Sequence, residues 1–306
     1  MALPRVAVVQ APRAREMKLV WLALLAAVNF SRAATPMLKT SDIMAWPAEP
    51  ADAVVAYGPG PLQNAELRLP KTPGPHPVAV VLHGGCWQAA YDRTHTGRMS
   101  AALARAGFAV WTPEFRRLGD AGGGWPGTFS DIGDAVENLR AVAAKYSLDL
   151  TRVVLVGHSA GGHLALWYAG APRLPATSPL HRKNPLPIRG VVALAAVSDL
   201  RAPDTACEDA GVQLIGGGQF LAARLRDASP LAMLPLGAPS RLIHGALDKI
   251  VPPALSRDFA AAAQKSGDDA REVAVAGTGH FELIDPTSPA WPAVLAAVRE
   301  LAAAKE

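Results

Sequence analysis

The most informative part of the chain reads Val153-Val154-Leu155-Val156-Gly157-His158-Ser159-Ala160-Gly161-Gly162. Its first four residues are apolar and three of them are β-branched, which is typical of a buried strand in a parallel sheet. The stretch 163–169 that follows is apolar after His163 and predicts a buried helix. A serine in a sharp strand-to-helix turn needs glycines nearby, because a Cβ atom at Gly157 or Gly161 would meet the neighbouring chain. The pattern predicts that the Ser159 hydroxyl lies above the sheet edge, at a helix N-terminus that stabilises developing negative charge.

The overall charge excludes nucleic acid as a partner. The chain has 306 residues, is 50% hydrophobic and has a formal net charge of +4. Residues 1–33 alone contribute a net of +4, so the remainder is close to neutral and has no basic face to offer. Length and composition suit one large α/β domain.

The N-terminal residues resemble a targeting signal. From Met17 the chain has a lysine, an apolar run over 19–28 and small residues at Ser31 and Ala33. We expect a leader over 1–33 with a signal peptide starting at Met17, and hence a periplasmic or secreted protein, or a cytoplasmic one if the signal is not real. The alternatives are a retained N-terminal anchor and a helix that belongs to the fold. Residues 34–51 are expected to be a surface or poorly ordered segment, and we expect no stable membrane partner beyond the leader.

The remainder, 52–306, alternates between strand and helix patterns in a single domain. Strands are expected at 52–57, 65–70, 78–83, 108–113, before Gly157, and at 191–197, 241–245 and 272–276. Helices are expected at 99–106, 132–146 (capped by Ser130 or Asp131), 163–169, 252–266 and 290–303, with a short insertion at 201–229. This alternation predicts an α/β fold with a mainly parallel twisted sheet of about eight strands and helices on both faces.

Two later loops carry residues that can activate Ser159. A serine hydroxyl needs a base to accept its proton, and a third group to hold that base in the correct tautomer. Asp248 follows the strand 241–245, and His280 follows the strand 272–276, so both can reach the end of the sheet that holds Ser159. Each could instead be an ordinary loop residue, and Asp199 and Asp285 are weaker candidates for the acid. We expect the side chain of His158 to point away from the site, and His163 and His244 to be packed or hydrogen-bonded rather than catalytic.

The strand 78–83 ends in a loop that can stabilise an oxyanion. His83-Gly84-Gly85-Cys86-Trp87 leaves backbone N–H groups free, and we assign the oxyanion hole to the amides of Gly85, Cys86 and Ala160. His83 is expected to order this loop rather than transfer a proton. The alternative is a simple glycine turn at a strand end.

Together these motifs resemble the α/β-hydrolase superfamily, in its esterase/lipase branch with a His-Gly-Gly loop. The residues that carry the resemblance are Gly157–Gly162, His83–Trp87, Gly245–Asp248 and Gly279–His280. His-Gly-Gly-x-Trp-Gln is also similar to kynurenine formamidases of the serine type. The resemblance implies an α/β-hydrolase fold and a serine hydrolase that cleaves carboxylic esters through an acyl-enzyme. The short insertion favours small or aryl substrates, and we expect that no metal or organic cofactor is required. Arylformamidase activity is the alternative, and a non-catalytic ligand-binding protein on this scaffold is a further one.

The sequence gives weaker signals for the substrate specificity and the oligomeric state than for the catalytic residues. Trp87, Tyr91 and Trp125, with residues of the insertion, are candidates for a substrate pocket that takes a small-molecule ester or amide. The alternative is that these aromatic residues only pack within the scaffold. A monomer or a homodimer is expected. Cys86 occupies a position where the His-Gly-Gly loop of the esterase/lipase branch usually has glycine. It can either form a disulfide with Cys207 or remain a buried thiol.

Overall fold

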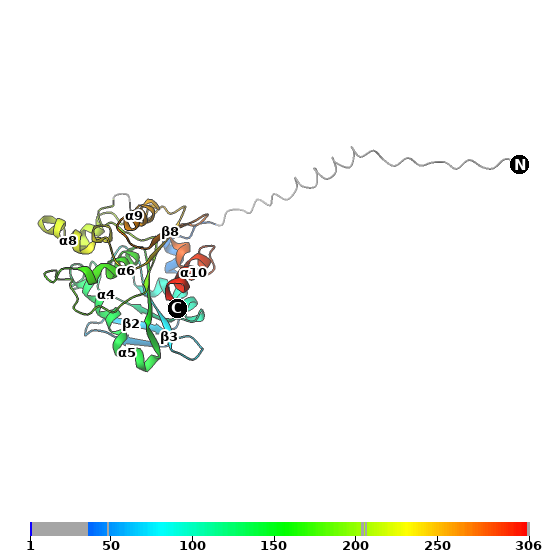
Figure 1. Ribbon diagram of the computed structural model, residues 1–306, viewed down its shortest axis with the longest axis horizontal. Coiled ribbons are helices and arrows are strands. Elements are labelled where there is room, and N and C mark those ends of the chain that lie inside the picture. The colour runs from blue at the N-terminus through cyan, green and yellow to red at the C-terminus, as the bar shows by residue number, and fades with distance from the viewer. Residues whose placement is uncertain (2–35, 48, 203–204, 206, 305–306) are drawn as a thin grey trace. The chain divides into compact units, whose positions relative to one another are not determined.

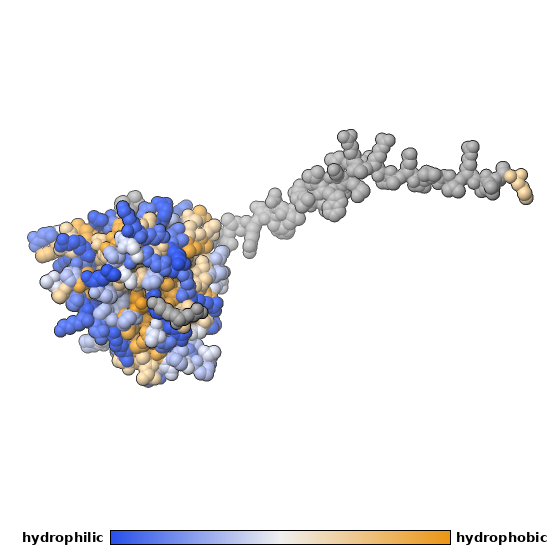
Figure 2. Space-filling view, viewed as in Figure 1, coloured by the Kyte–Doolittle hydropathy of each residue, from blue (hydrophilic) through white to orange (hydrophobic). Residues whose placement is uncertain are grey.

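The computed structural model describes residues 1, 36–47, 49–202, 205 and 207–304. The expected signal peptide therefore lies outside the described residues. Met37–Glu306 form one compact unit. No helix among the described residues is long and apolar enough to cross a membrane. On the face drawn in Figure 2, hydrophilic and apolar residues are interspersed.

The centre of this unit is an eight-stranded sheet with the lateral order β1-β2-β4-β3-β5-β6-β7-β8. The strands are β1 (Ala53–Ala56), β2 (Asn64–Arg68), β3 (His76–Leu82), β4 (Ala109–Pro113), β5 (Leu148–His158), β6 (Gly190–Leu194), β7 (Ser240–Gly245) and β8 (Ala270–Val275). The pairs β1–β2 and β2–β4 are antiparallel, and all other neighbours are parallel. The expected sheet, including its antiparallel edge, is confirmed. Because β3, β5, β7 and β8 are parallel, the loops after them emerge at one edge.

Helices cover both faces of the sheet, with α4 and α6 on one side and α10 on the other (Figure 1). The helices are α2 (Thr40–Met44), α3 (Gly97–Arg105), α4 (Gly127–Glu137), α5 (Leu139–Tyr146), α6 (Ala160–Gly170), α7 (Ala210–Leu214), α8 (Leu221–Ala228), α9 (Ala254–Lys265) and α10 (Trp291–Ala302). Short 3₁₀ turns include η1 (Arg93–Thr96) and η5 (Phe281–Ile284).

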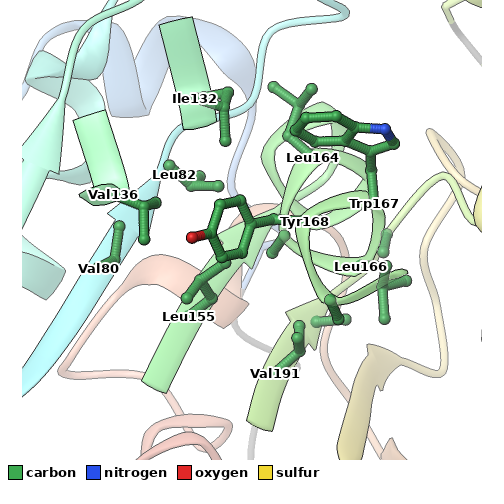
Figure 3. Close-up of a cluster of buried hydrophobic side chains, with 14 of the residues drawn as sticks. Val80, Leu82, Ile132, Val136, Leu155, Leu164, Leu166, Trp167, Tyr168 and Val191 are labelled. Carbon is green, nitrogen blue, oxygen red and sulfur yellow. The ribbon is translucent and has the colours of Figure 1, made fainter. Parts of the chain in front are cut away.

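The inner strands, β3 to β7, are largely buried on both faces, so alternate residues enter two separate cores. In β3, Val80 and Leu82 pack with Leu155 and with Tyr168 of α6, as Figure 3 shows. Ala79 and Val81 face the other way, into a second cluster beneath α3 and α10. This double burial explains why the strands read as continuous apolar runs.

The expected single helix over 132–146 is wrong in its start and its continuity. It begins at Gly127, after Pro126, and it is two helices, α4 and α5, that meet at Asn138. Neither Ser130 nor Asp131 is a cap. Asp131 is fully buried inside α4, where it accepts a hydrogen bond of 2.6 Å from the Arg116 guanidinium. Buried apolar residues continue at helical spacing across Asn138, so the sequence pattern could not reveal the break.

The segment expected to be a surface or poorly ordered region contains a helix. Within 34–51 the structure forms α2, whose Ile43 is only 3% exposed and packs into the second apolar cluster. The insertion 201–229 contains α7 and α8 and no strand among its described residues.

Candidate active site

Ser159 occupies a strained turn between β5 and α6. Its φ is +55°, in the left-handed region that a residue with a side chain rarely adopts. A Cβ atom at Gly157 would lie 2.2 Å from the Gly161 carbonyl oxygen, and one at Gly161 would lie 2.1 Å from the Leu82 carbonyl oxygen. Only glycine therefore allows the turn to close and to pack against the end of β3.

His280 and Asp248 meet beyond the ends of β7 and β8. The Nδ1 atom of His280 lies 2.7 Å from Oδ2 of Asp248, and both residues are buried. A Cβ atom at Gly245, the last residue of β7, would lie 2.1 Å from the Gly279 carbonyl oxygen. The absence of a side chain at Gly245 lets the two loops approach closely enough for this contact.

The Asp248 carboxylate is held by further donors. Its Oδ1 accepts hydrogen bonds from the backbone N–H groups of Ile250 (2.7 Å) and Val251 (3.0 Å). Nε2 of His244 lies 3.2 Å from Oδ2. Burial alone would raise the pKa of Asp248, but the hydrogen bonds from His244 and His280 outweigh it and lower the pKa below its usual range. The carboxylate is therefore ionised and fixed in orientation. His244 was expected to be packed or hydrogen-bonded, and it is.

The other acids considered for this position have different partners. Asp199 accepts a hydrogen bond of 3.1 Å from the Ser229 hydroxyl. Asp285 accepts one of 2.8 Å from the Thr287 hydroxyl. Among the described residues, Asp248 is the carboxylate that contacts His280.

Ser159 and His280 line the same cavity, which has a volume of about 220 Å³. Its other lining residues are Thr40, Ile43, Gly85, Cys86, Tyr91, His95, His158, Ile250 and Phe281. The part of the chain that is described has no hydrogen bond between the Ser159 hydroxyl and the imidazole, and such bonds often tighten only when substrate binds. The geometry brings the serine, the histidine and the carboxylate to one site.

The loop after β3 lies beside Ser159. Gly85 and Cys86 both line the cavity, and both have a positive φ, of 102° and 50°. Ala160 is the first residue of α6, where a backbone N–H has no partner within its own helix. Within the described residues, the amides of Gly85, Cys86 and Ala160 donate no hydrogen bond. These three amides are therefore available to a ligand.

Cys86 also forms a disulfide with Cys207, which settles the pairing that the sequence left open. The two residues are 121 positions apart, and their Cα atoms are separated by 5.2 Å. Cys207 lies just before α7, so the bond ties the insertion to the loop after β3.

His83 orders this loop. It is fully buried, its Nε2 lies 2.9 Å from Oε1 of Glu114, and its Nδ1 lies 2.9 Å from the Gly84 carbonyl oxygen. Burial raises the pKa of Glu114, but the adjacent His83 and Arg117 lower it to about 2. His83 therefore contacts an ionised carboxylate and the Gly84 carbonyl rather than the cavity.

His158 has a contact that the sequence did not reveal. We expected its side chain to point away from the site, yet its Nε2 lies 3.1 Å from the carbonyl oxygen of His280. The two imidazole rings are 4.5 Å apart between centroids. Only the strand-to-helix turn and the His280 loop together produce this contact, so no local sequence signal could have identified it.

The three aromatic residues proposed for a substrate pocket have three different environments. Tyr91 lines the cavity that contains Ser159. Trp87 does not: it is 1% exposed, and its Nε1–H donates to Nδ1 of His163 at 3.2 Å. Trp125 lines a separate groove of about 640 Å³, together with Phe220 and Arg224 of the insertion. Trp87 is a core residue because its indole N–H finds a buried acceptor.

No metal site is evident in the part of the chain that the structure covers, since it holds no group of three His, Cys, Asp or Glu side chains placed to bind an ion. What the arrangement offers is a hydroxyl, an imidazole oriented by a carboxylate, and free backbone amides around one cavity.

A family model described as BD-FAE matches residues 66–263, well over half of the chain. The chain belongs to the BD-FAE family. This matched region contains Ser159 and Asp248, and His280 follows it. Membership agrees with the esterase branch of the α/β-hydrolases that the motifs resemble.

Among curated relatives, esterase LipQ of Mycobacterium tuberculosis (strain ATCC 25618 / H37Rv) is 26% identical over 227 residues, which cover 70% of this chain and 52% of LipQ. Esterase LipC of the same organism is 26% identical over 248 residues, covering 76% of this chain and 60% of LipC. The chain thus spans about half the length of the curated relatives it matches.

Solved structures share the fold of this BD-FAE member. Esterase B from Lactobacillus rhamnosis superposes with a TM-score of 0.72 at 19% identity, covering 94% of this chain and 93% of that one. A truncated form of carbohydrate esterase from gut microbiota gives a TM-score of 0.70 at 22% identity, covering 83% and 97%. Both confirm the α/β-hydrolase fold.

Proposed function

We propose that this protein is a serine hydrolase that cleaves carboxylic esters of small or aryl substrates through an acyl-enzyme. The observation that carries the proposal is the 2.7 Å contact between His280 Nδ1 and Asp248 Oδ2, at a cavity that His280 shares with Ser159. The esterases among its relatives support hydrolysis of an ester bond.

In the first half-reaction, the Ser159 oxygen attacks the ester carbonyl carbon while Nε2 of His280 accepts the hydroxyl proton. Asp248 accepts a hydrogen bond from Nδ1–H of His280, which leaves Nε2 free to act as the base and stabilises the imidazolium that forms. The amides of Gly85, Cys86 and Ala160 stabilise the oxyanion. The intermediate collapses, the C–O bond to the alcohol breaks, and His280 gives its proton to the leaving alkoxide.

In the second half-reaction, water attacks the acyl-enzyme and gives its proton to His280. The tetrahedral intermediate then breaks at the Ser159 oxygen, which recovers the proton, and the carboxylic acid leaves. Each proton taken by His280 is returned, so the cycle needs no cofactor.

The test compares two buried serines. We expect Ser159→Ala to lower the turnover of p-nitrophenyl acetate by roughly 10⁴-fold or more. The control is Ser240→Ala, because Ser240 is 2% exposed and lies at the opposite end of β7 from Asp248. Equal turnover by both variants would contradict the proposal. A parallel assay with N-formylkynurenine tests the amide alternative: a faster Ser159-dependent reaction there would reassign the substrate while keeping the nucleophile.

A further inference from the structure

The N-terminal segment Met37–Met44 forms part of the cavity around Ser159. Thr40 and Ile43 line it, although they lie far from Ser159 in the sequence. Ile43 is 3% exposed and belongs to the same apolar cluster as Phe281, the residue after His280. Part of the cavity wall is therefore an aliphatic side chain that is fixed by packing.

One carboxylate holds this segment in place. Oε1 of Glu282 accepts a hydrogen bond of 2.5 Å from the backbone N–H of Leu38, and Oε2 accepts one of 2.9 Å from that of Gly279. Farther along, the Arg98 guanidinium lies 4.7 Å from the Trp46 ring centroid. The segment is thus tied to the loop that carries His280, and Ile43 is held in a fixed position over the cavity.

The cavity is small and lies on the side of the oxyanion loop. Its volume of about 220 Å³ is below the range of about 300–1,000 Å³ that is common for ligand pockets. An ester carbonyl whose oxygen meets the amides of Gly85 and Cys86 places the two groups on its carbonyl carbon beside these residues. The alcohol leaves in the first half-reaction, whereas the acyl group stays bonded to Ser159, so we assign this small cavity to the acyl group.

We infer that Ile43 is a specificity-determining residue, which closes the acyl site and restricts the substrates to esters of short-chain carboxylic acids. This inference rests on the proposed function, since it concerns the substrate of the same serine. The physical basis is steric exclusion, because a longer acyl chain would have to displace the packed side chain of Ile43. If the cavity had room for one more methylene group of the acyl chain, burial of that group would favour binding by about fourfold.

The experiment measures kcat/KM for p-nitrophenyl acetate, butyrate and octanoate. We expect the wild-type protein to favour acetate or butyrate over octanoate. Ile43→Ala should raise the octanoate-to-acetate ratio of kcat/KM about tenfold or more. Ile43→Phe should act in the opposite direction and lower the butyrate-to-acetate ratio.

A matched control is Val294→Ala. Val294 is fully buried in the same apolar cluster as Ile43 but does not line the cavity. It should leave the ratios of kcat/KM unchanged.

The inference is overturned if the wild-type protein hydrolyses octanoate with the same kcat/KM as acetate, or if the folded Ile43 variants keep the wild-type ratios. A loss of all Ser159-dependent turnover, by contrast, would count against the proposed function itself. A series of acetate esters with larger alcohols should show no comparable response to Ile43→Ala; if it does, the cavity holds the alcohol and the inference fails.

Discussion

The imidazole of His158 lies against that of His280, with ring centroids 4.5 Å apart, and its Nε2–H donates to the His280 carbonyl oxygen at 3.1 Å. A carbonyl only accepts, so Nε2 of His158 carries the hydrogen. Burial, with the neighbouring His280 as a smaller cause, holds the pKa of His158 well below its usual value. A neutral ring therefore lies beside the imidazole that must become positively charged in each half-reaction.

We expect His158 to be a positioning residue for His280. His158→Phe keeps a ring in the packing but leaves the His280 carbonyl without its donor, and it should lower kcat about tenfold with little change in KM. His158→Gln, whose amide N–H can reach the same carbonyl, should stay within about threefold of the wild type. Steady-state kinetics with a melting temperature for each variant makes the check. Equal loss of activity in both variants would show that the ring, not the hydrogen bond, matters.

Acid should destabilise the fold through His163. Its Nδ1 accepts from the Trp87 indole N–H and its Nε2–H donates to the Ala228 carbonyl, so a second ring proton would face a donor. Burial lowers the pKa of His163 to about 4. Because this pKa is lowered on folding, the unfolded chain binds more protons between about pH 6.5 and 4, and stability falls as the pH drops through that window.

The size of this effect can be measured by urea unfolding. His163→Gln can make both hydrogen bonds and does not titrate. Between pH 7.5 and pH 5, the wild type should lose about 2 kcal/mol more than this variant. Equal losses in the two proteins would mean that His163 does not titrate as its surroundings require.

The disulfide between Cys86 and Cys207 should support both stability and the oxyanion loop. Replacing both residues with serine should lower the free energy of unfolding by about 2–4 kcal/mol. It should also lower kcat, because the amide of Cys86 loses its fixed position; the loss should stay below the roughly 10²–10³-fold cost of removing a donor outright. Wild-type protein treated with a reductant should match the double variant. If the double variant kept the wild-type kcat but was less stable, the disulfide would support only the stability of the fold.

Much of the fold and the central part of the site could be predicted from local patterns. Buried parallel strands appear as apolar runs, and the residues after them, such as Asp248 and His280, must lie at one edge of the sheet. The glycines of the Ser159 turn are required by close contacts of the backbone, so they too leave a sequence signal.

Features that depend on contacts between distant segments could not be predicted in this way. The pairing of Cys86 with Cys207 and the position of Ile43 over the cavity join segments that are far apart in the chain. Trp87 was misassigned for the same reason: an aromatic residue after an oxyanion loop suggests a pocket, but its acceptor, His163, lies on α6.

The most direct test is to map the adduct of a fluorophosphonate probe by mass spectrometry. The account predicts one covalent adduct, on Ser159, formed together with the loss of ester turnover and absent from Ser159→Ala. An adduct on another residue, or full turnover by a protein that carries the adduct on Ser159, would contradict it.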